Sequence, residues 1–577
     1  MNRFLDVSAW AADRLAWSLR ARGVRGTLKR ALRPLRARIG LPEKAEDLEQ
    51  AYRRFLRREQ SRRGPSARHP LLKESADRPM VSLVAHLGMD GDLGATVRSL
   101  EAQRYSRWEM VLVGEGPAVE PVGPLTRDPR VRVEREAGGR GSALARGLAA
   151  SRGALCAVVQ PGDELDPDAL LEAVMLFEER PDLDLVYTDE DEVDGAGHRS
   201  RPRFKPDWSP DLFDALDYVG RLAIVRRRAV EAVGGLADAP EGAEEYDLLL
   251  RVTERGPVGH VARVLYHGRA QGPFDDGAAC EALRRALHRR GQAGRISRLR
   301  PRVRRVDAGV SGAPLVSLIV PTRDQSDLLR GLVESVERLS SYRRFEFLVV
   351  DNGSADPAAL HYLEELGRRW RVLRNTRPFN WSALNNAAAR AATGEYLVFV
   401  NNDVQVLSES WLEAMIGEAQ RPEVGVVGAR LLYRDHTIQH AGIVAGLGGV
   451  AGHAFRHLPA ETTEPLGGAT VKRNWSAVTG ACMMVRRTTL EALGGFDERL
   501  AVAYNDVDFC LRARSRGLLV VYTPSATLLH LEFATRFRID PRQDRRLFVR
   551  RWAHLLEAGD PYYNPNLSWE VGDWRAG

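Results

Sequence analysis

The sequence has few cysteines, no long apolar run and no recognisable secretion signal. Its four cysteines lie far apart among 577 residues and form no CxxC pair, which excludes a disulfide framework and a zinc ribbon and favours a reducing compartment. No stretch approaches the roughly 18 consecutive apolar residues that a membrane-spanning helix needs. The first residues lack an apolar core followed by a small-residue cleavage site. We therefore expect a cytoplasmic protein.

Two common nucleotide-binding patterns are excluded as well. No GxxxxGK segment followed by Ser or Thr occurs, so the chain is not a phosphate-loop ATPase. Residues 446–451 match a GxGxxA dinucleotide pattern, but the chain reaches Pro459 too soon to form the helix that must follow it.

Positive charge is concentrated at the start of the chain. The formal net charge is +7, yet residues 1–70 alone hold 18 Arg and Lys against 7 Asp and Glu. The basic character therefore belongs to this segment, and we expect no nucleic-acid binding. Within residues 1–40, Trp10, Trp17 and aliphatic residues recur at near-heptad spacing among basic residues. This pattern predicts peripheral attachment to an anionic membrane surface, at the inner face of the cell membrane. The alternative is a pair of helices docked on the following domain.

The most informative feature is an internal repeat with a long period. Pro79–Val84 recurs as Pro314–Ile319, and Trp108–Val113 recurs as Phe345–Val350. Further matches follow in the same order while the offset grows from 235 to 263 residues, as insertions into a second copy require. Copies of this length are too long for solenoid units, so each is a domain. Chance similarity is the alternative, and seven collinear matches argue against it.

Each copy alternates short β-branched runs with amphipathic helical stretches. This alternation predicts an α/β fold, with a mostly parallel sheet covered by helices on both faces. In such sheets, ligands bind beyond the carboxyl ends of the strands. We divide the chain into a basic amphipathic extension, a first α/β domain, an Arg-rich linker and a second α/β domain, at residues 1–77, 78–288, 289–312 and 313–577.

Two carboxylates follow predicted strands of the second copy. Asp351 comes directly after Val350, where it can accept hydrogen bonds from a base or a ribose; a tight turn is the alternative. Asp403 ends an Asn-Asn-Asp segment after Val400 and could hold a hard divalent cation that bridges a nucleotide diphosphate. The alternative for Asp403 is a helix N-cap.

Two further residues could complete a reaction site. Asp506 precedes a helical pattern and could act as a general base toward a hydroxyl nucleophile. The alternative is that Asp506 caps this helix while Asp508 pairs with Arg512 four residues later. His530 closes a strand-like run and could be a metal ligand or a structural residue.

The order of these signals resembles the inverting glycosyltransferases of family two, which have the GT-A nucleotide-sugar-binding fold. The resemblance is strongest to large bacterial proteins that carry two such domains in tandem, are assigned to surface-polysaccharide (O-antigen) biosynthesis, and are often called rhamnosyltransferases. It covers about residues 78–570 and is carried by segments 320–324, 350–354, 377–386, 400–403, 439–444, 449–454, 503–512 and 560–568.

The resemblance implies a role for each matching residue on the donor side. Pro321 and Thr322 would border the nucleotide, and Asp351 would bind its base or ribose. Asn385 and Asn402 would also contact the nucleotide.

For the reaction itself, the resemblance makes Asp403 and His530 the metal ligands and Asp506 the base that deprotonates the acceptor. It places the acceptor near Trp475, Thr479, Gly480 and Asp508. The sequence departs from the family at Asn505, where many relatives have Glu, and at Leu531, where relatives have a second histidine.

The first copy serves as an internal control for these roles. Opposite Asp351 it has Gly114, and opposite Asp403 it has Gly162. A site without these carboxylates cannot readily neutralise a diphosphate leaving group, so we predict that this domain is catalytically silent and serves to scaffold or bind glycan. Rescue by Asp163, one residue further on, is the alternative. The positions of Asp506 and His530 are taken by Glu245 and His267.

We therefore predict an inverting, metal-dependent glycosyltransferase that uses Mn²⁺ or Mg²⁺. It would move a sugar from a nucleotide-sugar donor to a hydroxyl of a lipid-linked or growing surface glycan, with the chemistry in the second domain. Two alternatives remain open: a bifunctional glycan polymerase with both domains active, and a non-catalytic glycan-binding scaffold.

Overall fold

The computed structural model describes most of the chain, in two compact units. One unit comprises residues 1–70 and 575–577, and the other comprises residues 71–574. In the first unit the helix α3 (Leu48–Arg62) is described. The predicted membrane-binding segment, residues 1–40, lies outside the described residues, which are 48–62, 78–88, 91–115, 125–236, 239–269, 275–531, 541–570, 572 and 574–577. Among these residues, no helix has the length and apolar character needed to cross a membrane.

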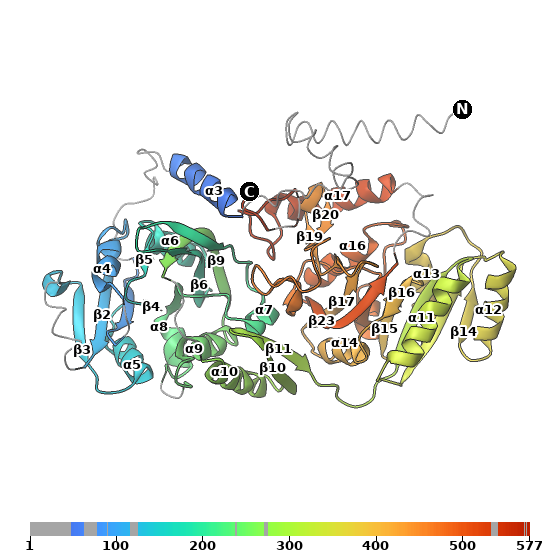
Figure 1. The fold of residues 1–577 in the computed structure, drawn as a ribbon, viewed down its shortest axis with the longest axis horizontal. Coiled ribbons are helices and arrows are strands. Elements are labelled where there is room, and N and C mark those ends of the chain that lie inside the picture. Colours follow the sequence, from blue (N-terminus) through green and yellow to red (C-terminus); the bar gives the residue numbers. More distant parts are fainter. Residues whose placement is uncertain are drawn as a thin grey trace. The chain divides into compact units, whose positions relative to one another are not determined.

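The second unit contains the two predicted domains, which follow one another along the chain (Figure 1). The strands of the first domain are β1 (Val81–His86), β2 (Trp108–Gly114), β3 (Val131–Arg135), β4 (Leu155–Val158), β5 (Glu164–Leu165), β6 (Leu185–Val193), β7 (Arg199–Arg203), β8 (Ala223–Arg226) and β9 (Val258–Gly268). Its helices are α4 (Leu93–Glu101), α5 (Arg140–Ala150), α6 (Ala169–Glu179), α7 (Pro210–Ala215), α8 (Arg227–Ala232), α9 (Glu244–Thr253) and α10 (Asp276–Arg289).

The second domain repeats this pattern. Its main sheet contains β12 (Val316–Thr322), β13 (Phe345–Asp351), β14 (Arg371–Arg374), β15 (Tyr396–Val400), β16 (Val404–Val406), β17 (Val424–Leu432), β18 (Ile438–His440), β21 (Arg473–Asn474), β22 (Cys482–Arg486) and β23 (Leu519–His530). A separate pair is β19 (Ile443–Ala445) with β20 (Ala451–His453). Its helices are α11 (Ser326–Leu339), α12 (Pro357–Gly367), α13 (Trp381–Ala391), α14 (Trp411–Ala419), α15 (Arg487–Ala492), α16 (Asn505–Arg514) and α17 (Arg542–Ala558).

The two sheets have the same strand order. The first is β3-β2-β1-β4-β8-β6-β9-β5 and the second is β14-β13-β12-β15-β22-β17-β23-β16. The strand registers agree too. Leu185 of β6 pairs with Val225 of β8 in the first sheet, as Val426 of β17 pairs with Val485 of β22 in the second. The duplication read from the sequence is therefore present in the fold.

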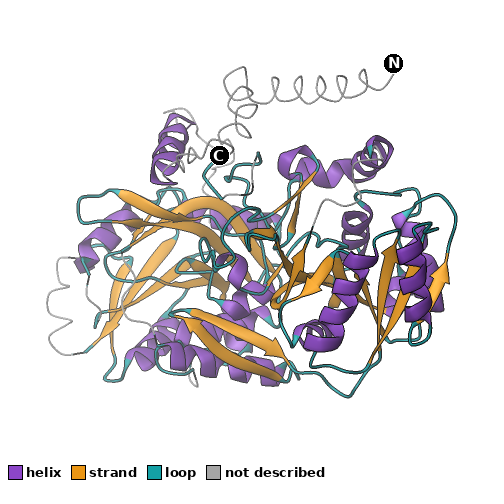
Figure 2. Ribbon diagram, turned by 45° about the vertical axis from the view of Figure 1, so that its right-hand side comes forward, coloured by secondary structure: helices purple, strands orange, loops and turns teal. Residues whose placement is uncertain are grey.

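The prediction of mostly parallel sheets is right for only part of each sheet. Strands β14, β13, β12 and β15 run parallel and are covered by helices, as Figure 2 shows. Strand β22 then runs antiparallel to both of its neighbours, and β16 runs antiparallel to β23. The sheet is therefore mixed.

The Arg-rich segment predicted as a linker contains an antiparallel strand pair, β10 (Gly294–Arg300) and β11 (Val303–Ala308). Val303 and Val306 are buried in the core of the first domain, with Ile296 packed against it. These buried apolar side chains explain why the segment folds onto the domain, although its arginines dominate the sequence.

Within the second unit, a buried ion-pair network joins the two domains. Asp211 of α7 is fully buried and lies 2.5 Å from Arg421 and 3.5 Å from Lys472 of the second domain. Lys472 also pairs with Glu418 at 2.8 Å, and Asn474 donates to Asp211 at 2.7 Å. Burial alone would raise the pKa of Asp211, but Arg421 and Lys472 lower it to about 2.

We expect Asp211→Ala to lower the free energy of unfolding by about 3 kcal/mol, because it leaves Arg421 and Lys472 buried with one carboxylate fewer. Since the folded-state pKa lies below the unfolded value, the difference between wild type and variant is full above about pH 4 and shrinks as pH falls toward 2. Thermal unfolding of wild type and variant across this pH range measures the difference in stability. Asp182→Ala, which removes an exposed pair with Arg180, is the control and should change nothing measurable; equal effects of the two variants would contradict the network's role.

Candidate active site

The carboxyl ends of β12 and β13 form the proposed nucleotide-binding side of the site. These strands are parallel neighbours, and their register sets Thr322 beside Asp351. Asp351 is 1% exposed, and its carboxylate accepts hydrogen bonds from the Ser354 amide and Arg374, each at 2.8 Å. Asp351 therefore shapes the turn after β13, as the turn interpretation expected. Pro321 lies one residue before Thr322 and is partly exposed.

A hydrogen bond connects this side to the Asn-Asn-Asp segment after β15. The Asn402 amide donates to the hydroxyl of Thr322 at 3.0 Å. Asn385, predicted to contact the nucleotide, is instead fully buried in α13, where its amide donates to the Trp381 carbonyl at 2.8 Å. Its side-chain oxygen has no hydrogen-bond donor among the described residues. The structure thus brings Asn402, but not Asn385, to the edge of the sheet.

Strand pairing brings the two proposed metal ligands together. Because β16 and β23 pair with Val404 opposite His530, the preceding Asp403 lies against this histidine. The distance from its Oδ1 to His530 Nε2 is 3.1 Å. Both polar atoms of the Gln439 side-chain amide lie close to Nδ1 of the same ring, the nitrogen at 2.6 Å and the oxygen at 2.9 Å, so Gln439 orients the imidazole toward Asp403. Gln439 was not predicted as a site residue from the sequence, where its only signal was its place in the segment 439–444.

Asp403 and His530 fit a divalent cation that the substrate helps to bind. They offer one carboxylate and one imidazole nitrogen oriented by a second residue, a donor set that Mn²⁺ and Mg²⁺ accept. Within the part of the chain that the structure describes, no three His, Cys, Asp or Glu side chains cluster as a closed metal cage. Such an open pair leaves coordination positions for diphosphate oxygens and water.

Asp506 is held at the start of α16 by its backbone surroundings. Tyr504, just before the helix, has a left-handed φ of 62°, an uncommon conformation for a residue with a side chain. The Asp506 carboxylate accepts hydrogen bonds from the backbone amides of Gly480 at 2.9 Å and Val507 at 2.8 Å. A Cβ atom at position 480 would lie 2.9 Å from the ring of Trp381, so this close approach requires glycine.

Hydrogen bonds between their neighbouring residues link the three carboxylates along one edge of the sheet. The backbone amide of Asn401, two residues before Asp403, donates to the Ala481 carbonyl at 3.1 Å. The backbone amide of Gly480, next to Ala481 in the chain, donates to the Asp506 carboxylate. On the other side, Asn402 contacts Thr322 beside Asp351. Thr479 is buried in the same strand connection, where its amide faces His440 at 3.4 Å.

Two predicted acceptor residues lie in the core instead. Trp475 is 0% exposed and packs against Phe455 and Trp574. Asp508 is also fully buried, and its oxygens accept hydrogen bonds from Arg512 at 2.8 Å, Arg551 at 2.5 Å and Trp552 at 3.0 Å. The pairing of Asp508 with Arg512, weighed from the sequence as the structural interpretation, is what the structure shows. Neither side chain is placed to contact an acceptor.

The same arrangement recurs in the first domain, which identifies it as part of the fold. Asp247 of α9 pairs with Arg251, and Arg251 also donates to the carbonyls of Val233 and Gly235. Asp508 and Arg512 are their counterparts.

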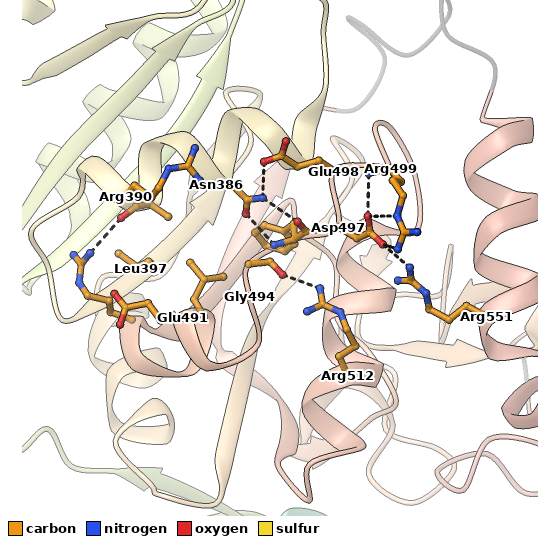
Figure 3. Close-up of a pocket in the computed structure, with 15 residues that line it drawn as sticks. Asn386, Arg390, Leu397, Glu491, Gly494, Asp497, Glu498, Arg499, Arg512 and Arg551 are labelled. Carbon is orange, nitrogen blue, oxygen red and sulfur yellow. Dashed lines mark hydrogen bonds and ion pairs between the residues drawn. The ribbon is translucent and has the colours of Figure 1, made fainter.

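A cavity of about 640 Å³ lies beside α13 and contains none of the predicted site residues. Figure 3 shows its charged side chains directed at one another: Arg499 and Arg551 both point to Asp497. The pair with Arg551 ties the loop between α15 and α16 to α17.

In the first domain, strand pairing corrects the sequence alignment. Glu164 faces His267 across β5 and β9 as Val404 faces His530, so the counterpart of Asp403 is Asp163 and not Gly162. Asp163 is 1% exposed, and both its oxygens contact Arg221, at 2.7 and 2.9 Å. It also accepts hydrogen bonds from the Tyr266 hydroxyl at 2.9 Å and the Arg269 amide at 2.8 Å.

The other counterparts in the first domain are also occupied by ion pairs. Glu245, at the position of Asp506, pairs with Arg140. Burial alone would lower the pKa of His267, but Asp166 and Asp191 raise it. Nδ1 of His267 lies 2.6 Å from Oδ1 of Asp191, so a carboxylate of the same domain already contacts this ring.

Comparison with known proteins places the chain in a family. The model of "Glycosyl transferase family 2" matches residues 90–234 and 317–494, one segment in each domain. The chain is 40% identical over 86% of its length to "O-antigen biosynthesis protein RfbC" of Myxococcus xanthus, covering 41% of that protein. It is 41% identical over 83% of its length to "Uncharacterized protein y4gI" of Sinorhizobium fredii (strain NBRC 101917 / NGR234), covering 56%. The chain thus spans about half the length of the curated relatives it matches.

Among solved structures, the chain is similar to a crystal structure of GalNAc-T7 with UDP, GalNAc and Mn²⁺. The two share 15% identity and a TM-score of 0.37 over 45% of this chain and 52% of the other. The family match covers both copies of the repeat, and the two sheets have one topology. The predicted fold class, two tandem GT-A domains, is confirmed, and the chain belongs to glycosyl transferase family 2.

Proposed function

We propose that the second domain is an inverting, metal-dependent glycosyltransferase and that the first domain binds glycan without catalysing transfer. The donor is a nucleotide-sugar, and the acceptor is a hydroxyl of a lipid-linked or growing surface glycan. The observation that carries this proposal is the chain of contacts that joins Asp351, Asp403 and Asp506 along one sheet edge. The name of the Myxococcus relative, an O-antigen biosynthesis protein, supports the choice of acceptor.

On the donor side, Pro321 and Thr322 border the nucleotide, and Asp351 and Asn402 contact it. The carboxylate of Asp351 is held rigidly by Ser354 and Arg374, which fixes its oxygens before the ligand arrives. Mn²⁺ or Mg²⁺ held by Asp403 and His530 would offset the charge on the departing diphosphate.

On the acceptor side, Asp506 takes the proton of the attacking hydroxyl. The acceptor oxygen bonds to the anomeric carbon as the bond from that carbon to the diphosphate breaks, and the nucleoside diphosphate leaves. One displacement inverts the anomeric centre. The acceptor lies near Thr479 and Gly480, because these residues flank Asp506 and leave its carboxylate partly exposed.

Two other functions are less well supported. A bifunctional polymerase needs a metal site in the first domain, where Arg221 pairs with Asp163. A non-catalytic scaffold does not explain why Asp506 keeps a partly exposed carboxylate at the start of α16, held by the Gly480 amide. The membrane attachment predicted for residues 1–40 remains a prediction.

The metal role is tested by a matched pair of variants, Asp403→Asn and Asp163→Asn. We expect Asp403→Asn to reduce release of nucleoside diphosphate from a nucleotide-sugar panel by at least about 100-fold, because it removes the charged ligand of the leaving-group cation. Asp163→Asn should leave the rate per folded molecule within about threefold, since Arg221 already occupies its carboxylate, although loss of this buried pair should lower the melting temperature. EDTA should abolish activity and Mn²⁺ restore it. Loss of activity in Asp163→Asn alone would contradict the assignment of the chemistry to the second domain.

The base is tested by Asp506→Asn. We expect kcat to fall by about 10²–10⁴ while KM for the donor stays unchanged, because a general base acts in the transfer step and not in donor binding. The matched control is Asp508→Asn, two residues along the same helix. It should lower the melting temperature, because it weakens the buried contacts with Arg551 and Arg512. An Asp506→Asn enzyme with wild-type kcat would refute the base assignment.

A further inference from the structure

The first domain keeps an open cavity where the second domain has its proposed reaction cleft. The cavity measures about 910 Å³, within the size range of ligand pockets. Gln160, Gly220 and Glu245 line it, and their counterparts in the second domain are Asn401, Gly480 and Asp506. The ion pairs that replace the proposed catalytic groups have therefore not filled the space.

The lining of this cavity combines an apolar floor with a charged rim. Leu216, Val225, Leu249 and the ring of Tyr246 supply apolar surface. Five arginines and four acidic residues supply polar groups: Arg140, Arg203, Arg221, Arg298, Arg302, Asp217, Glu245, Asp275 and Asp276. Sugars present both apolar ring faces and hydroxyl groups, so this mixture suits a saccharide.

The turn between β10 and β11 places an arginine on the rim. Arg302 has a left-handed φ of 65°, a conformation that is unfavourable for residues with a side chain. The Asp276 carboxylate stabilises it by accepting a hydrogen bond from the Arg302 amide at 2.8 Å. Strain of this kind, retained at the mouth of a cavity, is typical of functional positions.

Three arginines lie on this side of the cavity, two of them in ion pairs: Arg203 with Glu190 at 2.8 Å and Arg221 with Asp163 at 2.7 Å. Burial and repulsion from Arg203 and Arg221 lower the pKa of Arg302. Arg304 does not line the cavity and is 0% exposed, and its guanidinium carbon lies 4.8 Å from the centre of the ring of Tyr246, which does line it. None of its three nitrogens has a hydrogen-bond acceptor among the described residues. An anion beside Arg302 would offset the repulsion that Arg203 and Arg221 exert on it.

The Arg221–Asp163 pair and the position of the cavity limit the kind of ligand that can bind. Arg221 neutralises Asp163, the counterpart of the proposed metal ligand, so the anion would be held by an arginine and not by a metal cation. The lining includes no residue from the ends of β1 or β2, where the equivalent strands of the second domain form the proposed nucleotide side. The cavity therefore corresponds to the acceptor part of the cleft and not to the nucleotide part.

We propose that the first domain binds an anionic saccharide, bearing carboxylate or phosphate groups, in this cavity without a metal ion. The inference rests on the glycan-binding role proposed for this domain and adds the chemistry of its ligand. Arg302 binds the anionic group, while Arg221 and Arg203 keep their ion pairs with Asp163 and Glu190. The apolar floor with Tyr246 contacts the sugar ring.

The test is calorimetric titration of the full chain in EDTA with three probes: trigalacturonate, glucose 6-phosphate and the neutral maltotriose. We expect at least one anionic probe to bind and maltotriose not to bind, and the two anionic probes separate carboxylate from phosphate recognition. Arg302→Gly should weaken binding by about tenfold or more, because it removes a charge-assisted contact. Glycine suits the left-handed backbone at this position, so the variant should fold.

The matched control is Arg499→Ala, an exposed arginine of the second-domain cavity, which should bind the anionic probe as wild type does. Asp403→Asn should also leave this binding unchanged while it abolishes transfer, so failure of the transferase proposal and failure of this inference are distinguishable. Absence of binding, equal binding of maltotriose, or an affinity unaffected by Arg302→Gly would each overturn the inference.

Discussion

The pairing of a short strand with the last long strand of the sheet determines what each domain can do. In the second domain, β16 lies against β23 so that Val404 faces His530, which sets Asp403 within 3.1 Å of the imidazole. In the first domain, β5 and β9 pair in the same register and present Asp163 in the same way. The backbone therefore offers a carboxylate at this point in both copies, and the partner of that carboxylate distinguishes the two domains.

In the first copy, that partner is a cation of the protein itself. Arg221 stands where the second copy has Ala481, and it binds both oxygens of Asp163. A buried carboxylate needs a counter-charge, because its desolvation is costly when it is unpaired. In the second copy, the uncharged Ala481 occupies the position of Arg221, and Asp403 lies 3.1 Å from the imidazole of His530. The change from a small to a basic residue at this position is therefore one difference between the two sites.

The sequence predicted the repeat, the α/β fold and the order of polar residues along the sheet edge, since these follow from local patterns and collinear matches. It did not predict that Asp163, and not Gly162, corresponds to Asp403, because a difference of one residue in the loop is visible only in the strand register. Arg221 was missed for a related reason: it is 58 residues from Asp163 in the chain. The burial of Asn385 and Trp475 was also missed, because a motif match does not show which side of a helix or strand a residue occupies.

The two domains are held in one unit by polar contacts as well as by packing. Asn564, near the end of the chain, donates to Asp189 of β6 at 2.8 Å, and Asp211 is buried against Arg421. Leu466 and Val471 of the second domain belong to the hydrophobic core of the first. A domain integrated to this degree cannot be lost without exposing its neighbour, so structural need alone would preserve the first copy. Structural need does not, however, account for an open cavity rimmed by Arg203, Arg221 and Arg302, since a core under no other constraint favours close packing. The cavity is therefore the feature that argues for a ligand in the first domain.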